Sequence, residues 1–130
     1  MLIIYPAIIH FEDGAYWSEF PDLKGCFSSG DTIEEIIVNS QESLTVHTEV
    51  LLEKGTALPT PTNIKDIHVE KDSFTTLISV DLSKFLNRAK TVKKTLTIPS
   101  WLNDIAMREN VNFSGILQNA LIEQLHLTNQ

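Results

Sequence analysis

Acidic side chains are frequent in the first third of the chain, and four of them could form a carboxylate cluster like the metal site of a nuclease. These four are Asp13, Glu19, Asp22 and Asp31. Divalent cations such as Mg²⁺ prefer oxygen ligands of this kind. However, Asp13 and Asp22 fall in predicted turns, and Asp31 stands where a helix needs an N-cap. The pattern favours structural roles, and we predict no metal site.

The single cysteine and the four histidines do not form a second catalytic set. A nucleophilic thiol needs a general base and an activating environment, so Cys26 is better explained as a small buried thiol. The histidines lie far apart at no metal-ligand spacing: His10, His47, His68 and His126. There is no glycine-rich phosphate loop either. We predict no catalytic residue and no cofactor, and therefore a protein that is not an enzyme.

Composition narrows the class of protein. Hydrophobic residues make up 42% of the 130 residues, which is enough for a packed core. No apolar run reaches the roughly 18 residues that a membrane helix needs. The start of the chain lacks the basic residues of a signal peptide, and one cysteine cannot form an intrachain disulfide. We therefore expect a cytoplasmic protein with no membrane association.

Charge divides the chain into two parts. Residues 1–80 carry 13 acidic and 4 basic side chains, a net charge of −9, whereas residues 81–130 carry 4 acidic and 6 basic ones, a net charge of +2. An acidic part suits a basic protein partner, and a basic part suits phosphate. Two solvated surfaces without partners would give the same pattern, so charge alone leaves both interpretations open.

The first 86 residues predict one layered α+β domain of order βββαββ. Five segments are rich in β-branched and aromatic residues, and turn residues such as Asp13-Gly14, a strong hairpin signal, separate them. The predicted strands are Leu2–Phe11, Ala15–Phe20, Gly25–Ser28, Ile64–Val69 and Phe74–Val80. Asp81 is expected to cap a short helical turn that ends at Leu86.

One long helix is expected between the third and fourth strands. Asp31 is its predicted N-cap, with Glu34 in the capping-box position three residues later. Gly55 ends the helix, and Pro59 prevents it from resuming. Helical spacing predicts the buried face, which consists of Ile33, Ile37, Ser40, Leu44, His47 and Leu51.

Beyond a polar linker at residues 87–92 the pattern changes. Lys93–Ile98 alternates polar and apolar residues and predicts a short strand that ends at Pro99. Ser100 can cap a helix that reaches about Asn110, and Asn112 can cap a second helix. The apolar side chains expected to face inwards are Leu96, Ile98, Trp101, Leu102, Ile105, Ala106, Ile116, Leu117, Ala120, Leu121 and Leu125.

A strand-helix-helix unit of fewer than about 40 residues rarely folds alone without a metal or disulfides. A second copy would pair with the lone strand and complete the core, so we expect a dimer or a higher oligomer. This arrangement resembles the ribbon-helix-helix family of repressors over about residues 92–127. The residues that carry the resemblance are Thr95-Leu96-Thr97-Ile98-Pro99 and the downstream Asn112-Phe113-Ser114.

The ribbon-helix-helix resemblance implies DNA binding. Lys93, Thr95 and Thr97 would face the major groove, where a two-stranded ribbon reads base edges. The backbone amides at Asn112, Phe113 and Ser114 would hold a phosphate. A ribbon-helix-helix pair that serves only oligomerisation is the alternative.

The N-terminal segment carries a longer motif. Tyr16-Trp17, Phe20-Pro21-Asp22-Leu23, Gly25-Cys26 and Gly30-Asp31 follow one another in an order that is similar to the HicB antitoxin family. The Tyr5-Pro6-Ala7 segment, the long helix and Val80-Asp81-Leu82-Ser83 extend this resemblance. Lys24 stands where family members often have proline, a difference that does not alter the expected fold.

The HicB resemblance implies a partial RNase-H-like fold for residues 1–86, followed by the ribbon-helix-helix domain at 93–130. The partner would be a HicA-type toxin, a small basic protein of double-stranded-RNA-binding fold that cleaves mRNA using a histidine. The antitoxin would cover that site, and the complex would repress its own operon through operator DNA. An acidic surface suits such a partner. The residues expected at the toxin contact are Trp17, Glu19, Glu34, Glu35 and Glu42.

A function from another class fits the same sequence. It is a stand-alone ribbon-helix-helix transcriptional regulator whose N-terminal domain senses a small ligand. A neighbouring gene for a small basic protein would favour the antitoxin over this regulator.

Overall fold

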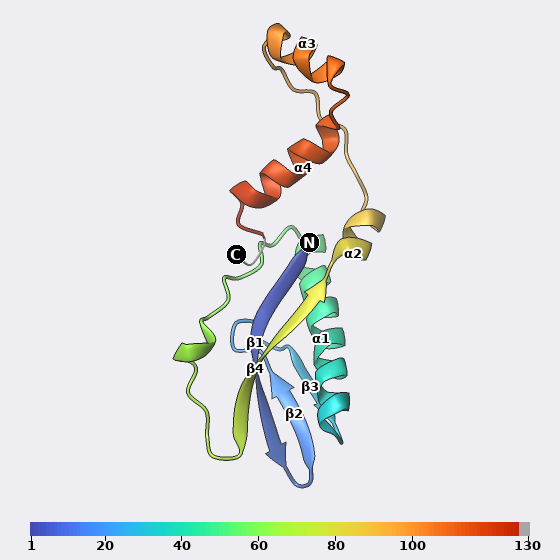
Figure 1. The fold of residues 1–130 in the computed structure, drawn as a ribbon. Coiled ribbons are helices and arrows are strands. Elements are labelled where there is room, and N and C mark those ends of the chain that lie inside the picture. The colour runs from blue at the N-terminus through green and yellow to red at the C-terminus, as the bar shows by residue number, and fades with distance from the viewer. Residues whose placement is uncertain (128–130) are drawn as a thin grey trace.

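A computed structural model describes residues 1–127 of the chain (Figure 1). It contains a four-stranded antiparallel sheet and four α-helices, so the predicted α+β class is correct. The elements are β1 (Leu2–Glu12), β2 (Ala15–Glu19), β3 (Phe27–Gly30), α1 (Ile33–Glu53), the 3-10 helix η1 (Ile64–Asp66), β4 (Ser73–Asp81), α2 (Ser83–Arg88), α3 (Ser100–Arg108) and α4 (Phe113–Gln124). The predicted C-terminal domain ends at 130, so its last three residues lie outside the described range.

The sheet has the strand order β3-β2-β1-β4, and every neighbouring pair is antiparallel. The hairpin between β1 and β2 turns at Asp13 and Gly14, whose φ angles are +53° and +78°. Positive φ at both central residues matches the twist of the flanking strands. The predicted Asp-Gly turn is therefore confirmed. The third strand covers Phe27–Gly30, two residues later than the predicted Gly25–Ser28.

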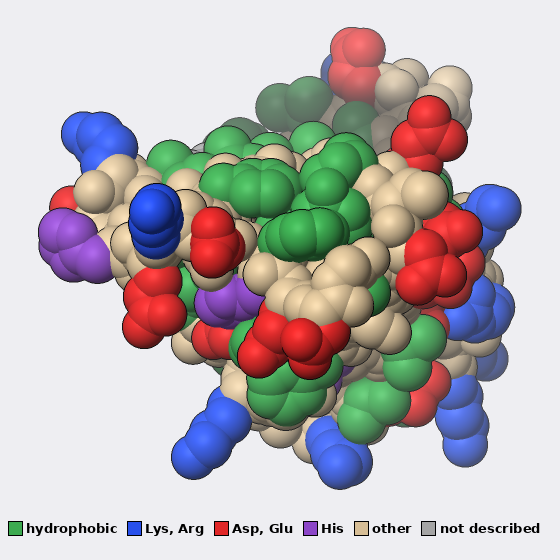
Figure 2. Space-filling model, turned by 90° about the horizontal axis from the view of Figure 1, so that it is seen from below, with side chains coloured by type: hydrophobic (Ala, Val, Ile, Leu, Met, Phe, Trp, Pro, Cys, Tyr) green, Lys and Arg blue, Asp and Glu red, His purple; other side chains and the backbone are tan. Residues whose placement is uncertain are grey.

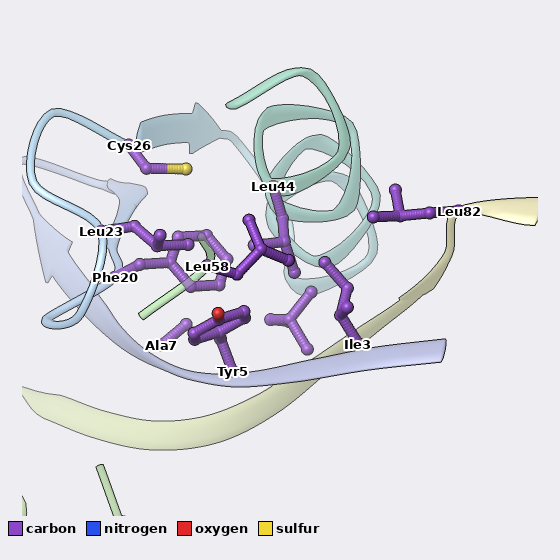
Figure 3. Packing of buried hydrophobic residues seen from close by; sticks show 10 residues of the cluster. Ile3, Tyr5, Ala7, Phe20, Leu23, Cys26, Leu44, Leu58 and Leu82 are labelled. Carbon is purple, nitrogen blue, oxygen red and sulfur yellow. The ribbon is translucent and has the colours of Figure 1, made fainter. Parts of the chain in front are cut away.

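The hydrophobic core lies between the sheet and α1 (Figure 3). Alternate β1 residues Ile3, Tyr5 and Ala7 point towards the helix and are fully buried. Figure 3 places Leu44 of α1 and Leu58 of the following segment over them. Burying a large aliphatic side chain contributes about 1.5–3 kcal/mol, so this layer provides much of the domain's stability.

Tyr5 places a polar group in this core. Its hydroxyl donates to the Pro59 carbonyl over 2.6 Å. Burial raises the pKa of Tyr5 to about 12, and the nearby Asp22 carboxylate acts in the same direction. The hydroxyl therefore remains protonated and able to donate, and it ties the segment after α1 to the central strand.

The helix begins one residue later than predicted. Thr32, not Asp31, is the N-cap, and its hydroxyl accepts the Glu35 N–H over 3.1 Å. Glu35, not Glu34, reaches back, and its Oε2 accepts the Asp31 N–H over 2.8 Å. Asp and Thr are both good N-caps, so the residue types alone could not fix this register.

The buried face of α1 also differs from the prediction near its start. Ile36 is buried, whereas the predicted Ile33 is 45% exposed. Ser40 and Leu44 are buried as predicted, and Ile37, Leu51 and His47 are partly buried. Ser40 Oγ lies 2.7 Å from Ser18 Oγ of β2, so a hydroxyl pair satisfies both polar groups inside the contact.

The predicted fifth strand at Ile64–Val69 is wrong. This stretch contains the short η1, and the domain has the order βββαβ before α2. Asp22 accepts the Thr62 N–H over 2.9 Å, and the Asn63 side chain accepts the Lys65 N–H over 3.0 Å. These contacts hold the backbone in a turn, and no strand of residues 1–127 pairs with this stretch.

Helix α2 closes the N-terminal body. Asp81 accepts the Ser83 N–H over 2.9 Å and the Ser83 hydroxyl over 2.6 Å, and these two hydrogen bonds lower the pKa of Asp81. Phe85 is buried against the body. The helix continues to Arg88, beyond the predicted end at Leu86, and Arg88 pairs with Glu49 of α1 over 3.0 Å.

The two C-terminal helices project away from the sheet (Figure 1). Asn112 caps α4 as predicted, and its side chain accepts the Gly115 N–H over 3.0 Å. Ser100 is the first residue of α3 rather than its cap, which is Pro99, and this helix ends at Arg108 instead of Asn110. Residues 93–98 form no strand in the single chain. A ladder needs a second strand, and the described chain offers none beside them.

Replacing Gly30 by alanine should destabilise the N-terminal body. An added Cβ would lie 2.8 Å from the Ile36 backbone nitrogen and 2.9 Å from the Glu35 Cβ, so the start of α1 would have to move. Overpacking of this kind costs about 1–3 kcal/mol. Urea unfolding followed by circular dichroism measures the cost. Ser29→Ala, at an exposed neighbouring position, is the control. Equal unfolding midpoints for the two variants would contradict the tight contact.

Candidate functional site

The residues predicted to contact a protein partner lie on two sides of the sheet. Ser18 points towards α1, because it pairs with Ser40. Its neighbours Trp17 and Glu19 therefore point to the opposite, helix-free face, since side chains alternate along a strand. Glu34, Glu35 and Glu42 lie on α1. Trp17 and Glu19 therefore lie together on one face of the sheet. The three glutamates of α1 lie together on the other face.

On the helix-free face, Trp17 lines a hollow that we name the aromatic groove. The groove has a volume of about 540 Å³ between the sheet and the segment before β4. Its floor is a stacked pair of rings, with the His10 and Trp17 centroids 4.0 Å apart and their planes 19° apart. The residues that line it are Ile8, His10, Phe11, Glu12, Trp17, His68, Val69, Glu70, Lys71, Asp72 and Ser73.

Hydrogen bonds fix the stacked rings. His10 Nδ1 lies 2.7 Å from Ser73 Oγ, and His10 Nε2 lies 3.0 Å from Glu19 Oε2. The Trp17 indole N–H donates to Glu12 Oε2 over 3.2 Å. Glu19 therefore contributes by orienting His10, and the groove presents aromatic surface beside carboxylates.

The second group lies on a surface formed by α1 and β3, which we name the helix surface. Glu34 and Glu42 are exposed there, whereas Glu35 is already used in the N-cap. Two shallow hollows of about 450 and 410 Å³ meet at Glu42 and Val46. Exposed apolar side chains surround them: Phe27, Val38, Val46 and Val50. An apolar patch edged by acids is suited to a protein contact.

The predicted DNA-binding residues are all exposed and form two groups. Lys93, Thr95 and Thr97 lie in the segment without regular structure before α3, whereas Asn112, Phe113 and Ser114 open α4. At this helix start, the Asn112 side chain accepts the Gly115 N–H. In the single chain the two groups do not form one site.

Apolar exposure is concentrated in the C-terminal segment. Most residues predicted to face inwards are exposed in the single chain, with Ala106 and Leu117 partly buried. The exposed ones are Leu96, Ile98, Trp101, Leu102, Ile105, Ile116, Leu121 and Leu125, together with Ala120. Apolar surface on this scale is rare on a monomer and indicates an interaction face.

The carboxylates that could have formed a metal site do not converge on one point, and two of them bind different partners. Asp22 holds Thr62, and Glu19 holds His10. Across residues 1–127, no three His, Cys, Asp or Glu side chains come close enough to hold a metal ion. Cys26 is buried as predicted, and desolvation raises its pKa to about 11.

None of the helices in the described part of the chain is both long and apolar enough to cross a membrane.

Comparisons with known proteins identify the family. The model of the HicB-like antitoxins of bacterial toxin–antitoxin systems matches residues 5–120. The chain belongs to the HicB-like antitoxin family. Membership of this antitoxin family suggests a non-catalytic, regulatory protein.

Solved structures with similar folds agree with this family. A chain of a toxin–antitoxin complex from Streptococcus pneumoniae is 29% identical, with a TM-score of 0.60 over 95% of this chain and 99% of that one. The Burkholderia pseudomallei antitoxin HicB is 26% identical, with a TM-score of 0.62 over 95% and 98%. A chain of the HicA3 and HicB3 toxin–antitoxin complex is 30% identical, with a TM-score of 0.51 over 61% and 99%.

Several lining residues of this HicB-like protein were not foreseen from sequence. His10, His68 and Asp72 line the aromatic groove, and Val38 and Val46 form the apolar part of the helix surface. The register of β1 with β2 and β4 brings His10 opposite both Trp17 and Ser73. The turn at Asp13-Gly14 fixes the pairing of His10 with Trp17. No local pattern carries the pairing of His10 with Ser73, because these two residues are far apart in the sequence.

The Cys26 thiol of this HicB-like protein should react slowly with alkylating reagents. Only the thiolate is nucleophilic, and at pH 8 a pKa of about 11 leaves about one thiol in a thousand ionised. Native protein should therefore react at least about 100-fold more slowly than protein unfolded in urea. Mass spectrometry after timed iodoacetamide treatment measures both rates. Equal rates would mean that the thiol is accessible and that its assignment to the core is wrong.

Proposed function

We propose that this HicB-like chain is an antitoxin that neutralises a HicA-type, mRNA-cleaving toxin by covering its active site and represses its own operon by binding operator DNA. The observation that carries the proposal is the similarity, over 95% of the chain, to a chain of a toxin–antitoxin complex. The family match over residues 5–120 supports the same role.

The toxin-binding part of the proposal rests on the N-terminal body, residues 1–86. The chain present in the HicA3 and HicB3 complex matches 61% of this chain across 99% of its own length. A chain about as long as the N-terminal body is thus found in a complex with a HicA toxin. The net charge of −9 on residues 1–80 suits a basic, RNA-binding partner, because complementary charge steers association.

The DNA-binding part rests on the C-terminal segment, residues 93–130. A second copy would pair with Lys93–Ile98 as an antiparallel ribbon and cover the exposed apolar side chains of α3 and α4. Leu96 and Ile98 would then face the shared core, and Lys93, Thr95 and Thr97 the major groove. Residues 87–92 would act as the connection between the two functions. A partial RNase-H-like fold of the N-terminal body belongs to the same proposal.

A chain that ends after Lys90 should neutralise the toxin but not bind the operator. It keeps the whole sheet, α1, and the ion pair between Arg88 and Glu49, so its core is intact. Co-expression with the toxin should restore growth as the full chain does, and gel shifts with promoter DNA should show no complex. The matched full-length control is the variant Lys93→Ala, Thr95→Ala, Thr97→Ala, which should also restore growth. A folded chain of residues 1–90 that gives no rescue would remove the N-terminal body from the proposed mechanism.

Charged substitutions in the ribbon should abolish both dimerisation and DNA binding. A Leu96→Asp, Ile98→Asp variant puts two carboxylates into the proposed shared core, where unpaired charge is strongly unfavourable. Sedimentation should show monomers, and operator binding should disappear. Lys93→Ala is the control that should remain dimeric while its operator binding weakens and its base preference changes, because the substitution removes a charged donor from the groove face. If the double variant remained dimeric and bound DNA as the wild type does, the proposed ribbon with Leu96 and Ile98 in a shared core would be wrong.

A further inference from the structure

The aromatic groove has features that neither the core nor the fold requires. It lies on the helix-free face, away from the layer between the sheet and α1. Figure 1 shows the segment between α1 and β4 running along the side of the sheet, and residues 68–73 of this segment form one wall. The hollow is therefore bounded by rigid strands on one side and by a connecting segment on the other.

The charge inside the groove is mainly negative. Three carboxylates line it, Glu12, Glu70 and Asp72, against one ammonium group, Lys71. His68 is exposed at the wall, and His10 is held by Glu19 and Ser73. Within the described chain, the side chains of Glu70 and Asp72 form no hydrogen bond and no ion pair, so their oxygens are free to accept.

Figure 2 shows acidic side chains around hydrophobic ones at the end of the molecule that carries the β1–β2 turn. Phe11, which lines the groove, is 48% exposed. The groove thus combines aromatic faces, free carboxylates and adjoining apolar surface. A cation on an aromatic face gains energy from the ring, and nearby carboxylates strengthen that contact.

We propose that the aromatic groove is a docking site for an arginine side chain of a basic protein partner. The flat guanidinium group can stack on the His10–Trp17 pair while its N–H groups donate to Glu70 and Asp72. Lysine fits less well, because its ammonium is a compact, strongly hydrated charge that neither stacks nor spans two carboxylates. The inference rests on the proposed function, since the partner that it serves is the basic toxin.

The groove is a better specific anchor than the helix surface. On the helix surface Glu34 and Glu42 stand among valines, which suits apolar contact over a broad area. In the groove the polar groups converge on one hollow of about 540 Å³, which suits insertion of a side chain. A partner that uses both would have to reach around the sheet, because the two surfaces face opposite ways.

The first experiment titrates the full-length, ¹⁵N-labelled protein with the peptide acetyl-Arg-Gly-Arg-amide. The reporter is the Trp17 indole N–H signal, identified by its loss in Trp17→Phe. We expect a saturable shift, with weaker binding of the matching lysine peptide. Glu70→Gln, Asp72→Asn should weaken arginine-peptide binding about tenfold. Glu34→Gln, Glu42→Gln, which removes the same charge from the helix surface, should change it less than about twofold.

The outcomes separate the alternatives. Equal weakening by the two charge-matched pairs would mean non-specific attraction and overturn the site, as would an unsaturable shift. Binding of free arginine as tightly as the peptide would point to a small-molecule sensor and overturn the protein-docking role.

A second measurement links the groove to the toxin. Co-expression of the toxin with Trp17→Ala, Asp72→Asn should restore growth less well than wild type. Full rescue by that variant would overturn the docking site and leave the proposed function intact. If the wild-type protein itself did not restore growth, the proposed function would be wrong, whatever the result of the peptide titration.

Discussion

The close contact between α1 and the strands β2 and β3 is the feature on which the rest of the structure depends. The contact uses small residues: Ser18 meets Ser40, and Gly30 lies directly beneath the start of the helix. Because the helix lies so near, Ile3, Tyr5, Ala7 and Ile9 of β1 are fully buried, and Ser18 is turned inwards. Strand alternation then forces Trp17 and Glu19 outwards. The packing of α1 on one face of the sheet thus determines which side chains are exposed on the other face.

The C-terminal segment depends on a different constraint. Its helices form locally, with Asn112 capping α4, but the described chain gives them almost nothing to cover their apolar sides. Hydrophobic burial, rather than helix propensity, supplies most helical stability in proteins. The two ends of the chain therefore obtain stability in different ways. The N-terminal body has an internal core, whereas α3 and α4 need a core shared with other polypeptide.

Much of the N-terminal fold could be predicted because its signals are local. Alternation gave β1 and β2, and Asp13-Gly14 gave the turn between them. The prediction was wrong where more than one residue could take the same structural role, and where a strand depended on a distant partner. Asp31 and Thr32 are both suitable caps, and Ile33 and Ile36 are both apolar residues in the first turn of the helix, of which only Ile36 is buried. Ile64–Val69 has the residue types of a strand. A strand also needs a free sheet edge to pair with, and the local sequence does not show whether one is available.

The candidate surfaces were foreseen only in part for the same reason. Trp17 and the glutamates stand out by residue type, but their separation onto opposite faces depends on strand register. The pairing of His10 with Glu19 and Ser73 requires contacts across 9 and 63 positions of the chain. A motif confined to one stretch of sequence cannot encode a groove whose walls come from three.

The segment between α1 and β4 has a further consequence for how this protein would be digested. It is fastened by Leu58 in the core, by the Tyr5 bond to Pro59, and by Asp22 at Thr62. From there to Ser73 it has only η1 and turns, with mostly exposed side chains. Local opening of this stretch costs less than global unfolding, so a protease should cut there first and leave the core assembled. Any molecule seated in the adjoining groove would shield the same stretch, so resistance to cleavage would report occupancy.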